Sequence, residues 1–580
     1  MTVYTAPLED IRFTLRHIGG LDSLAELPGL EHLDTETVDL VLEEAARFAR
    51  SELAPLDPVG DREGAVLVDG EVRTAPGFKE AYARFVEGGW NGLVFPEEWG
   101  GQNLPWLLNT AVAEMWNAAN MTFELCPLLT QAAVEALLHH GTEDQKRIYL
   151  RRLVSGEWTG AMCLTEPQAG SDVGALRTRA ERDGEIYRIR GQKIFITFGE
   201  HDMAENIVHL VLARLPGAPE GTKGISLFLV PKFLPDGNGR PGRRNDMRCI
   251  KLEEKLGIHA SPTCVIAYGE EEGAVGWLVG EENAGMRCMF TMMNNARISV
   301  GIEGLGIAER AFRRALAYAR ERIQGRRDGR PVPILAHPDV RRMLLTMRAY
   351  TAAMRALCYL ATAEVDRAAR DADGERRRAA AGRVALLTPL VKAWCTDRAC
   401  EIASLAVQVH GGAGFIEETG VAQHYRDVRI TPIYEGTNGI QALDLAGRKL
   451  TIENGRLPWD LFAELRTELG ALTRAGLSDL AGSLAPALST LERATREMQA
   501  RGAEQRAAAA TPYLQLFGQV LGGFLLARGA RAAGRDPAGA AWPGLARFYA
   551  TQLLPPALAL ADPAYGDLAA LDASLLPPAG

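Results

Sequence analysis

The chain has 580 residues, which is too long for one hydrophobic core and predicts several domains. Apolar residues make up 47% and charged residues 24%, values typical of a soluble globular protein. The formal net charge of −9 argues against nucleic acid as the main partner, because domains that bind it are usually basic.

The cysteines and the N-terminus indicate a reducing compartment. The eight cysteines form no Cys-x-x-Cys pair and no cysteine–histidine cluster with zinc spacing, so we predict buried free thiols and no metal site. The first twenty residues include Glu9 and Asp10 and lack the apolar run of a signal peptide. No apolar stretch of ~18 or more residues without a charge occurs, so we expect no membrane span and a cytoplasmic protein.

The N-terminal part is predicted to be helical after an extended arm. Residues 1–34 read as an N-terminal extension, and residues 35–160 as an α-helical domain. Thr142 and Gln145 have the spacing of a capping box, which marks a helix start. An earlier helix has apolar residues at spacings that make one face: Leu40, Val41, Ala45, Phe48, Ala49 and Leu53.

The pattern changes to strands in residues 161–280, which we predict to be an antiparallel β domain. Asp183-Gly184 is a strong hairpin turn signal between two strand-like flanks. The segments IVHLVLAR and GISLFLVP are short, rich in β-branched residues and bounded by glycine or proline.

Helical periodicity returns in residues 281–452, which we predict to be a second α-helical domain. A long helix, or a helix with a loose start, is expected at 290–323, with further helices near 337–370, 376–409 and 437–452. Residues 453–580 are rich in alanine and leucine and predict an additional helical domain.

Two stretches of the β domain contain polar or aromatic residues suited to a ligand. In AMCLTEPQAGSDVGAL, the hydroxyls of Thr165 and Ser171 and the nearby backbone N–H groups can hold a polar ring edge or a pyrophosphate, although an ordinary turn has the same composition. In GQKIFITFG, Phe195 and Thr197 alternate along a strand and are expected on one face.

Glycines interrupt both long helical segments. Gly301, Gly304 and Gly306 each cost ~1 kcal/mol inside a helix, which close packing against another helix or a ligand would explain. In QVHGGAGF, a helix C-cap explains one glycine, and the others let the backbone approach something closely. His410 is interpreted as a packed residue, and Arg322 either as a phosphate ligand or as a solvated surface residue.

The stretch TPIYEGTNGIQ places a lone carboxylate, Glu435, between an aromatic ring and a glycine. An acid that serves only solubility does not need such neighbours. We therefore interpret Glu435 as a catalytic base.

The chain resembles the acyl-CoA dehydrogenase family through five stretches that occur in the family's order: CLTEPQAGSD, KIFIT, ARISVG…ARERIQGR, QVHGGAGF and YEGTNGIQ. The resemblance spans roughly residues 35–452. It implies a mainly α fold in α–β–α order with a central antiparallel β domain, here followed by an extra C-terminal helical domain. The N-terminal extension and the last domain resemble a longer branch of the family, which includes 3-methylmercaptopropionyl-CoA dehydrogenases.

The resemblance implies a reaction and a cofactor. A family member binds FAD and oxidises an acyl-CoA to its trans-2-enoyl-CoA, and passes electrons to an electron-transfer flavoprotein. Glu435 would remove the α-proton, and the β-hydrogen would leave as hydride to flavin N5. The thioester here would be 3-methylmercaptopropionyl-CoA or a fatty acyl-CoA.

The resemblance also implies the binding residues and a homodimer or dimer of dimers, because the FAD contacts come from two subunits. The cofactor contacts are Leu164, Thr165, Ser171, Phe195, Thr197, Thr437 and Asn438, with Arg322, Gln408, Gly411 and Gly412 on the FAD of a neighbouring subunit. The substrate contacts are Ser171, Asn294, Arg297, Tyr434 and Gly436. Some branches carry the base just before the arginine that matches Arg297, where this chain has Ala296.

The chain departs from the family pattern at three of these places. RIQGR replaces the common Arg-Lys-Thr-Phe-Gly, Asn294 replaces an aspartate, and Phe195 replaces a tryptophan. Two other readings remain. An acyl-CoA oxidase that uses oxygen has the same fold, and one branch of the family binds DNA, although the net charge and Glu435 argue against that branch. The last domain would either shape the acyl tunnel or replace a dimer contact of the shorter relatives.

Overall fold

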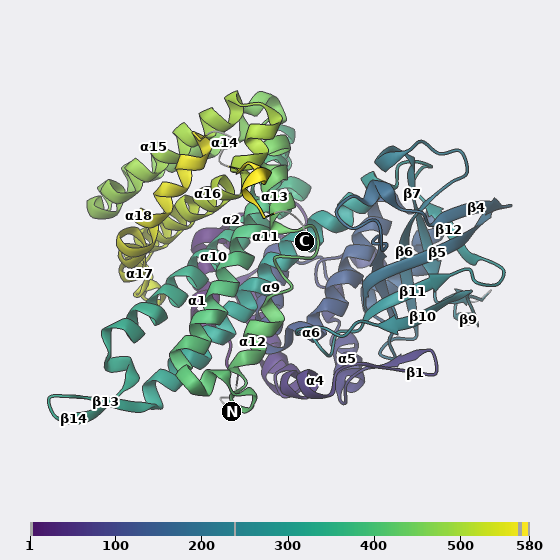
Figure 1. Cartoon of the computed structure of the whole chain (residues 1–580), viewed down its shortest axis with the longest axis horizontal. Coiled ribbons are helices and arrows are strands. Elements are labelled where there is room, and N and C mark those ends of the chain that lie inside the picture. The colour runs from purple at the N-terminus through teal and green to yellow at the C-terminus, as the bar shows by residue number, and fades with distance from the viewer. Residues whose placement is uncertain (1–3, 237–238, 567–570, 578–580) are drawn as a thin grey trace.

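The computed structural model describes residues 4–236, 239–566 and 571–577. Helices form one side of the molecule and a β domain forms the other (Figure 1). The chain runs from helices into the β domain, back into helices, and ends in a further helical unit. The predicted fold class is therefore confirmed.

The first residues are helical, so the prediction of an extended arm was wrong. α1 (Leu8–Thr14) and α2 (Leu21–Leu24) flank a π-helical turn. Phe13 on α1 is buried, and its ring centroid lies 5.0 Å from that of Trp542 near the other end of the chain. The partner of this apolar face lies more than five hundred residues away, which the local sequence pattern does not show.

The N-terminal helical unit surrounds one long buried helix. Its elements are α3 (Thr35–Phe48), α4 (Asp57–Glu63), β1 (Val66–Val68), β2 (Glu71–Arg73), α5 (Phe78–Glu87), α6 (Trp106–His140), α7 (Glu143–Gln145) and α8 (Arg151–Ser155). The predicted capping box of Thr142 and Gln145 begins α7. Leu40 was placed in the core wrongly: it is 64% exposed, because Val38 and Leu42 provide that part of the buried face.

Helix α6 is long and apolar enough to cross a membrane by length and composition, which the sequence analysis did not expect. In this structure 89% of its most apolar window is buried inside the protein, so it serves as a core helix. The helix bends at Asn120, which has non-helical φ and ψ angles. The Asn120 side chain accepts hydrogen bonds from the Thr122 hydroxyl at 2.7 Å and from the Phe123 N–H at 3.1 Å, and so caps the second half of the helix.

The β domain contains one large sheet with the strand order β10-β11-β5-β12-β7-β6-β3, and β4 pairs with β5. Its strands are β3 (Trp158–Cys163), β4 (Arg179–Asp183), β5 (Ile186–Thr197), β6 (Asn206–Arg214), β7 (Ile225–Pro231), β10 (Met247–Leu252), β11 (Thr263–Tyr268) and β12 (Ala274–Val279), and a small hairpin joins β8 (Phe233–Pro235) to β9 (Pro241–Arg244).

The pairing within this sheet is mainly antiparallel, as predicted. The exceptions involve β6: β3 runs parallel to it along its whole length, and Arg179 of β4 also pairs in parallel with Arg214. The predicted turn at Asp183-Gly184 joins β4 to β5, where Asp183 pairs with Ile186 and Gly184 has a φ of 64°.

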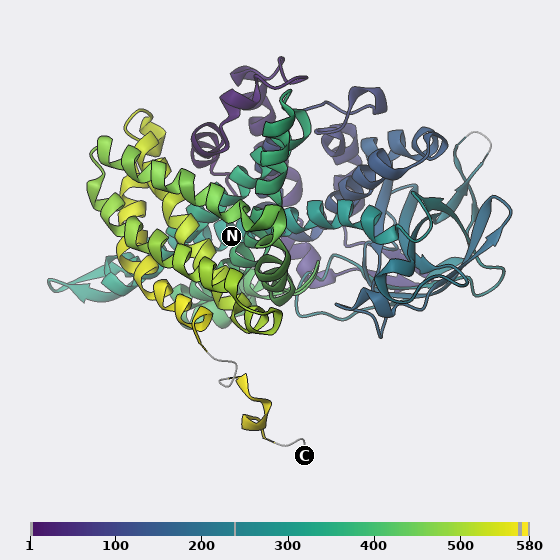
Figure 2. The ribbon, with the colours of Figure 1, turned by 90° about the horizontal axis from the view of Figure 1, so that it is seen from above.

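The second helical unit carries the longest helices. They are α9 (Gly285–Glu321), α10 (Pro338–Arg370) and α11 (Gly374–His410), followed by the shorter α12 (Val421–Val428) and α13 (Asn438–Asp444). α9 begins five residues before the predicted start. At its end the hairpin of β13 (Ile323–Arg327) and β14 (Arg330–Pro333) projects from the body of the protein (Figures 1 and 2).

Glycines in α9 allow it to pack closely between two other helices. A Cβ atom at Gly301 would lie 2.4 Å from Cγ1 of Val391 on α11. A Cβ atom at Gly306 would lie 2.6 Å from Cβ of Asn117 and 2.7 Å from the backbone N of Ala118, both on α6. Close packing therefore explains these helical glycines, as the sequence suggested.

The last domain packs against α10 and α11 and lies beside them in Figure 1. It contains α14 (Leu457–Arg474), α15 (Ser478–Ala500), α16 (Ala503–Ala532), α17 (Trp542–Phe548) and α18 (Leu554–Ala557). Gly518 of α16 faces the indole of Trp394 on α11 so closely that a Cβ atom would lie 2.3 Å from Cγ of that ring. The additional domain is thus joined to the second helical unit through a tight apolar contact.

We expect Gly306→Ala to destabilise the protein by about 1–3 kcal/mol, because the added methyl group meets the backbone of α6 and the packed helices have little room to separate. The control is Gly482→Ala on the exposed side of α15, where a Cβ atom meets nothing within 4 Å. That change should stabilise the chain by up to about 1 kcal/mol through helix propensity. Urea unfolding of both variants measures the difference, and equal midpoints would contradict the packing argument.

Candidate active site

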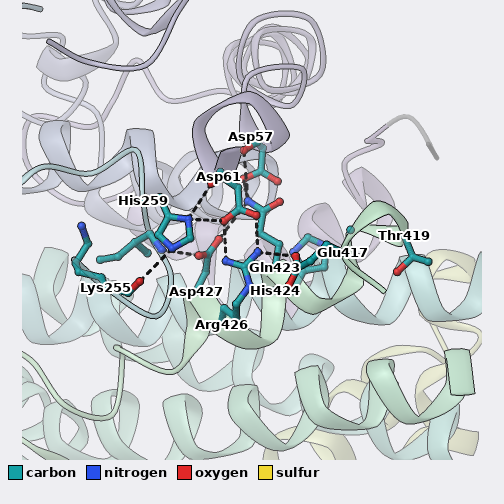
Figure 3. A network of polar contacts seen from close by, with 12 residues as sticks. Asp57, Asp61, Lys255, His259, Glu417, Thr419, Gln423, His424, Arg426 and Asp427 are labelled. Carbon is teal, nitrogen blue, oxygen red and sulfur yellow. Dashed lines mark hydrogen bonds and ion pairs between the residues drawn. The ribbon is translucent and has the colours of Figure 1, made fainter. Parts of the chain in front are cut away.

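Helix α12 is held in place by charged contacts to two other parts of the chain (Figure 3). The Arg426 guanidinium binds both carboxylate oxygens of Asp61 on α4, at 2.7 and 2.5 Å. The Asp427 carboxylate accepts the backbone N–H of Ile258 from the β domain at 2.6 Å. The helix that leads to Glu435 is therefore anchored to both the N-terminal unit and the β domain.

Burial raises the pKa of two carboxyl groups in this network, those of Asp427 and Asp57. Burial raises the pKa of Asp427 to about 6, although the hydrogen bond from Ile258 opposes the shift. Burial also raises the pKa of Asp57 on α4 to about 7, and Asp57 accepts a hydrogen bond from Gln423 at 3.0 Å. Both carboxyl groups therefore contact α12 or its neighbours through hydrogen bonds inside the protein.

Glu435 occupies an uncommon backbone conformation. Its φ is 57° and that of Gly436 is 83°, so two consecutive residues are left-handed. For a residue with a side chain, such a conformation costs of order 1–3 kcal/mol and needs support from its surroundings. The Glu435 carbonyl receives that support, because it accepts hydrogen bonds from Arg297 Nε at 3.3 Å and from Gln441 Nε2 at 3.4 Å.

The carboxyl group of Glu435 lies among protein atoms and near two cations. Burial raises its pKa above the ordinary value, while the charges of Arg297 on α9 and Lys392 on α11 lower it. Lys392 is itself buried, and that burial lowers its pKa to about 8. Glu435 thus combines a raised proton affinity with positive charge that favours the carboxylate.

A second acid, Glu303, lies beside the site and was not predicted. It is buried on α9, and its carboxylate accepts a hydrogen bond from the Tyr434 hydroxyl. Burial, together with the charge of Glu435, raises the pKa of Glu303 to about 8. An acid among the glycines and apolar residues of SVGIEGLG was the available sequence signal. Lys392, inside the apolar run PLVKAW, carried a similar one.

Thr437 and Asn438 form the start of α13. The Thr437 hydroxyl caps the helix by accepting the N–H of Ile440 at 3.2 Å. The Asn438 amide accepts a hydrogen bond from Lys392 Nζ at 2.9 Å and donates one to Asp397 at 2.7 Å. Asp397 in turn accepts a hydrogen bond from Gln515 of the last domain at 2.5 Å. This chain of contacts connects the loop that carries Glu435 to the additional domain.

A cavity of about 500 Å³ lies between α6, α9, α10 and α11, and Asn294 is in its wall. Ser299 and Ile302 of α9 also line it, so the cavity reaches the helical turn that carries Glu303. None of its lining residues belongs to the last domain, so within the described part of the chain that domain does not shape this cavity. A larger groove of about 1330 Å³ runs between the N-terminal unit and the β domain, and its walls contain none of the predicted site residues.

Four predicted residues of the β domain lie at neighbouring strand ends. Lys193 donates hydrogen bonds to the Leu164 carbonyl and to Glu166, both at 2.8 Å, and the N–H of Ile194 donates to the Thr165 carbonyl at 2.9 Å. These bonds hold the loop with Leu164 and Thr165 beside the end of β5, which carries the other two, Phe195 and Thr197.

The register of β5 with β11 shifts between Lys193 and Ile196, and the exposure still alternates after the shift: Phe195 is exposed, Ile196 is buried and Thr197 is half-buried. The φ of Phe195 is 59°, and its ring is 59% exposed. Ser171 is exposed in the loop that follows β3.

Four other predicted residues lie at the far ends of the long helices. Arg322 ends α9, and Gln408, Gly411 and Gly412 lie at the end of α11. Arg322 is 25 residues beyond Arg297, which corresponds to about 38 Å of helix. A Cβ atom at Gly411 or Gly412 would meet nothing within 4 Å, so the backbone there is open. The structure does not bring these residues together with Glu435 of the same chain.

Two simpler interpretations are confirmed. His410 is a packed residue: its ring stacks on Tyr318 with centroids 4.3 Å apart, and Nδ1 donates to the Ala406 carbonyl at 2.8 Å. Seven of the eight cysteines are buried free thiols, and Cys400 is half-buried. Within the described residues, no group of three or more potential ligands is arranged to hold a metal ion.

Four family models together match most of residues 35–571. Three family models, described as the N-terminal, middle and C-terminal domains of acyl-CoA dehydrogenase, match residues 35–157, 161–269 and 283–450. A fourth, described as acetyl-CoA dehydrogenase C-terminal like, matches residues 461–571.

Two curated relatives share much of the sequence. The chain is 47% identical over 540 residues to 3-methylmercaptopropionyl-CoA dehydrogenase of Ruegeria pomeroyi, a match that covers 91% of each protein. It is 35% identical over 468 residues to a butyryl-CoA dehydrogenase of Syntrophomonas wolfei, with 78% of this chain and 76% of that protein covered.

Solved structures share the fold. An acyl-CoA dehydrogenase of Bacillus anthracis complexed with FAD has a TM-score of 0.75 at 22% identity, with 95% of this chain and 90% of that chain covered. Butyryl-CoA dehydrogenase of Megasphaera elsdenii has a TM-score of 0.58 at 27% identity and covers 72% of this chain and 99% of its own. The first similarity includes the additional helical domain within its coverage.

The buried acid beside Tyr434 predicts a pH-dependent stability. The folded-state pKa of Glu303 is raised from 4.5 to about 8, so its contribution to stability is present below the unfolded value and is lost as pH rises through about 8. Glu303→Gln has no proton to lose. As the pH rises from 5 to 8.5, the free energy of unfolding of Glu303→Gln minus that of wild type should therefore increase by about 2–4 kcal/mol.

Urea unfolding at the two pH values measures this change, with Glu497→Gln on the exposed face of α15 as the control. A difference between Glu303→Gln and wild type that is the same at both pH values would show that Glu303 is not held protonated.

Proposed function

The chain belongs to the acyl-CoA dehydrogenase family of FAD-dependent oxidoreductases, as its sequence motifs suggested, and we propose that Glu435 is its catalytic base. The observation that supports this role most directly is that its carboxyl group has a raised pKa and lies near two cations. Glu435 is the acid of the YEGTNG motif, and the two cations come from α9 and α11. The reaction is the oxidation of an acyl-CoA to its trans-2-enoyl-CoA.

The residues around Glu435 suit removal of an α-proton from a thioester. Such a proton is weakly acidic, so the base needs a raised proton affinity and the developing enolate needs a hydrogen-bond donor. Burial provides the first. Within the described part of the chain, the backbone N–H of Glu435 has no acceptor, which leaves it free for the thioester oxygen. The left-handed conformation at residues 435 and 436 presents that N–H and the carboxyl together.

The β-domain residues suit the edge of a bound isoalloxazine ring. Phe195 is held by the register shift with its ring exposed, which is unfavourable for an aromatic side chain unless another group covers it. Leu164, Thr165 and Thr197 are half-buried beside it and supply apolar and hydroxyl groups. FAD, when bound, accepts the β-hydrogen of the substrate as hydride.

The positions at the ends of α9 and α11 suit the cofactor of a second subunit. Arg322 lies 25 residues beyond Arg297 on α9, and Gln408 lies 16 residues beyond Lys392 on α11, so these positions are remote from Glu435 of the same chain. The projecting β13–β14 hairpin and the open backbone at Gly411 and Gly412 fit contact with another copy of the chain. We therefore propose a homodimer or a dimer of dimers in which each FAD contacts two subunits.

The substrate we propose is a short thioether acyl-CoA, with 3-methylmercaptopropionyl-CoA as the first candidate because the R. pomeroyi relative carries that name. Electrons would then pass to an electron-transfer flavoprotein in the cytoplasm. An anaerobic spectrum during addition of 3-methylmercaptopropionyl-CoA, butyryl-CoA and palmitoyl-CoA tests the substrate, since the preferred chain bleaches the flavin fastest. Rapid reoxidation of that flavin by air would instead support an oxidase.

Glu435→Gln should retain FAD and lose about 10²- to 10⁴-fold in the rate of flavin reduction, because the amide cannot accept the α-proton. Stopped-flow absorbance with the best acyl-CoA measures the rate, and the visible spectrum reports the FAD content. Glu497→Gln is the control for a glutamate that lies outside the site. A Glu435→Gln rate within tenfold of wild type would place the base elsewhere.

Lys392→Met should move the acid limb of the pH profile for flavin reduction to higher pH. The ammonium group lowers the pKa of Glu435, so its removal leaves the base protonated over more of the pH range. Lys251→Met removes an exposed lysine of the β domain and should leave the profile unchanged. An acid limb of Lys392→Met that coincides with wild type would mean that this cation does not tune the base.

A further inference from the structure

The cavity beside α9 contains a buried acid that the proposed mechanism does not use. Glu124 lies just after the bend of α6 at Asn120 and is 5% exposed. It lines the cavity, and its Oε2 atom has no hydrogen-bond partner among the described residues. A buried carboxyl oxygen without a partner is unfavourable, so its presence needs an explanation outside the fold.

A second buried polar atom without a partner belongs to another residue of the same cavity wall. Asn117, one turn before the bend of α6, also lines the cavity and is 1% exposed. Its Nδ2 atom donates to the Ala113 carbonyl at 2.9 Å, which leaves Oδ1 as a buried acceptor without a donor in the described chain. Glu124 and Asn117 together therefore place a carboxyl group and an amide group in the wall of the cavity, each with one buried oxygen that has no partner among the described residues.

The protonation of Glu124 determines what it can offer. Burial raises the pKa of Glu124 well above the ordinary value. A neutral carboxyl group has an O–H that can donate a hydrogen bond, which a carboxylate does not have. No cation lowers the pKa of Glu124, whereas Arg297 and Lys392 lower that of Glu435.

The position of the cavity relates it to the acyl group. Ser299 and Ile302 of α9 line it and flank Glu303, whose carboxylate binds the Tyr434 hydroxyl next to Glu435. The cavity thus reaches the turn of α9 next to Glu303 and extends along α6 past Glu124. When the thioester group of a substrate lies at Glu435, the far end of its acyl chain would enter this cavity.

We propose that Glu124 donates a hydrogen bond to a heteroatom in the acyl group, so that this enzyme prefers acyl chains with a polar atom beyond the β-carbon over hydrocarbon chains of the same length. Asn117 Oδ1 accepts a second hydrogen bond when that heteroatom carries a hydrogen. The inference rests on the proposed function and adds a specificity residue to it. A pure alkyl chain would leave both buried polar atoms unpaired.

The test compares acyl-CoAs of equal length on wild type, Glu124→Leu and Glu124→Gln. Hexanoyl-CoA is the hydrocarbon, and 4-methoxybutanoyl-CoA and 5-hydroxypentanoyl-CoA place an oxygen at successive positions of the same chain. The readout is kcat/KM for anaerobic flavin reduction, expressed as the ratio of each oxygenated substrate to hexanoyl-CoA. Hexanoyl-CoA is thus an internal control for folding and FAD content in each variant.

Wild type should prefer at least one oxygenated chain by about tenfold, the effect of one hydrogen bond. Glu124→Leu should lose that preference and use hexanoyl-CoA at least as well as wild type, whereas Glu124→Gln, which keeps an N–H donor, should retain most of it. Glu124→Met is the second apolar variant if the leucine variant does not hold FAD.

The outcomes separate the two proposals. A wild-type ratio near one, or an unchanged ratio in the apolar variants, overturns the role of Glu124 while hexanoyl-CoA still reduces the flavin. If none of these thioesters and none of the panel above reduces the flavin of wild type, the proposed function fails and the role of Glu124 fails with it.

Discussion

The close packing of α9 between α6 and α11 is the constraint on which the site depends. The glycines at 301 and 306 remove the side chains that would keep these helices apart. With the helices in contact, Arg297 and Glu303 of α9 come within reach of the loop that carries Glu435, and Lys392 of α11 approaches it from the other side. The same packing leaves the cavity along α6 between this helix and α9, α10 and α11.

The three acids of this region differ in the cations and hydrogen-bond donors that lie near their carboxyl groups. Glu435 is half-buried near two cations, which partly compensate for its desolvation. Glu303 has the Tyr434 hydroxyl, and Glu124 has neither a cation nor a hydrogen-bond partner for Oε2. The proposed base, Glu435, must alternate between charged and neutral forms, so it needs the nearby cations. Glu124 is proposed only to donate a hydrogen bond, so it can remain neutral without them.

The loop of Glu435 is fixed at both of its ends. Before it, α12 is tied to α4 and to the β domain through Arg426 and Asp427. After it, Asn438 is tied through Asp397 to Gln515 in the last domain. These contacts hold a backbone that contains two consecutive left-handed residues, which isolated peptide segments rarely keep. The additional domain therefore supports the site from outside the cavity, by way of α11.

The sequence by itself determined the order of helical and β units, the capping box, the β4–β5 hairpin and the motif around Glu435, because each depends on residues close together in the chain. It did not show that residues 8–24 are helical or that Leu40 is exposed, since both depend on which surface a helix meets. Glu124, Glu303 and Lys392 became functional candidates only in the tertiary structure. Their significance lies in burial and in neighbours from other helices, and desolvation of a charge is a property of the assembled core rather than of a local sequence.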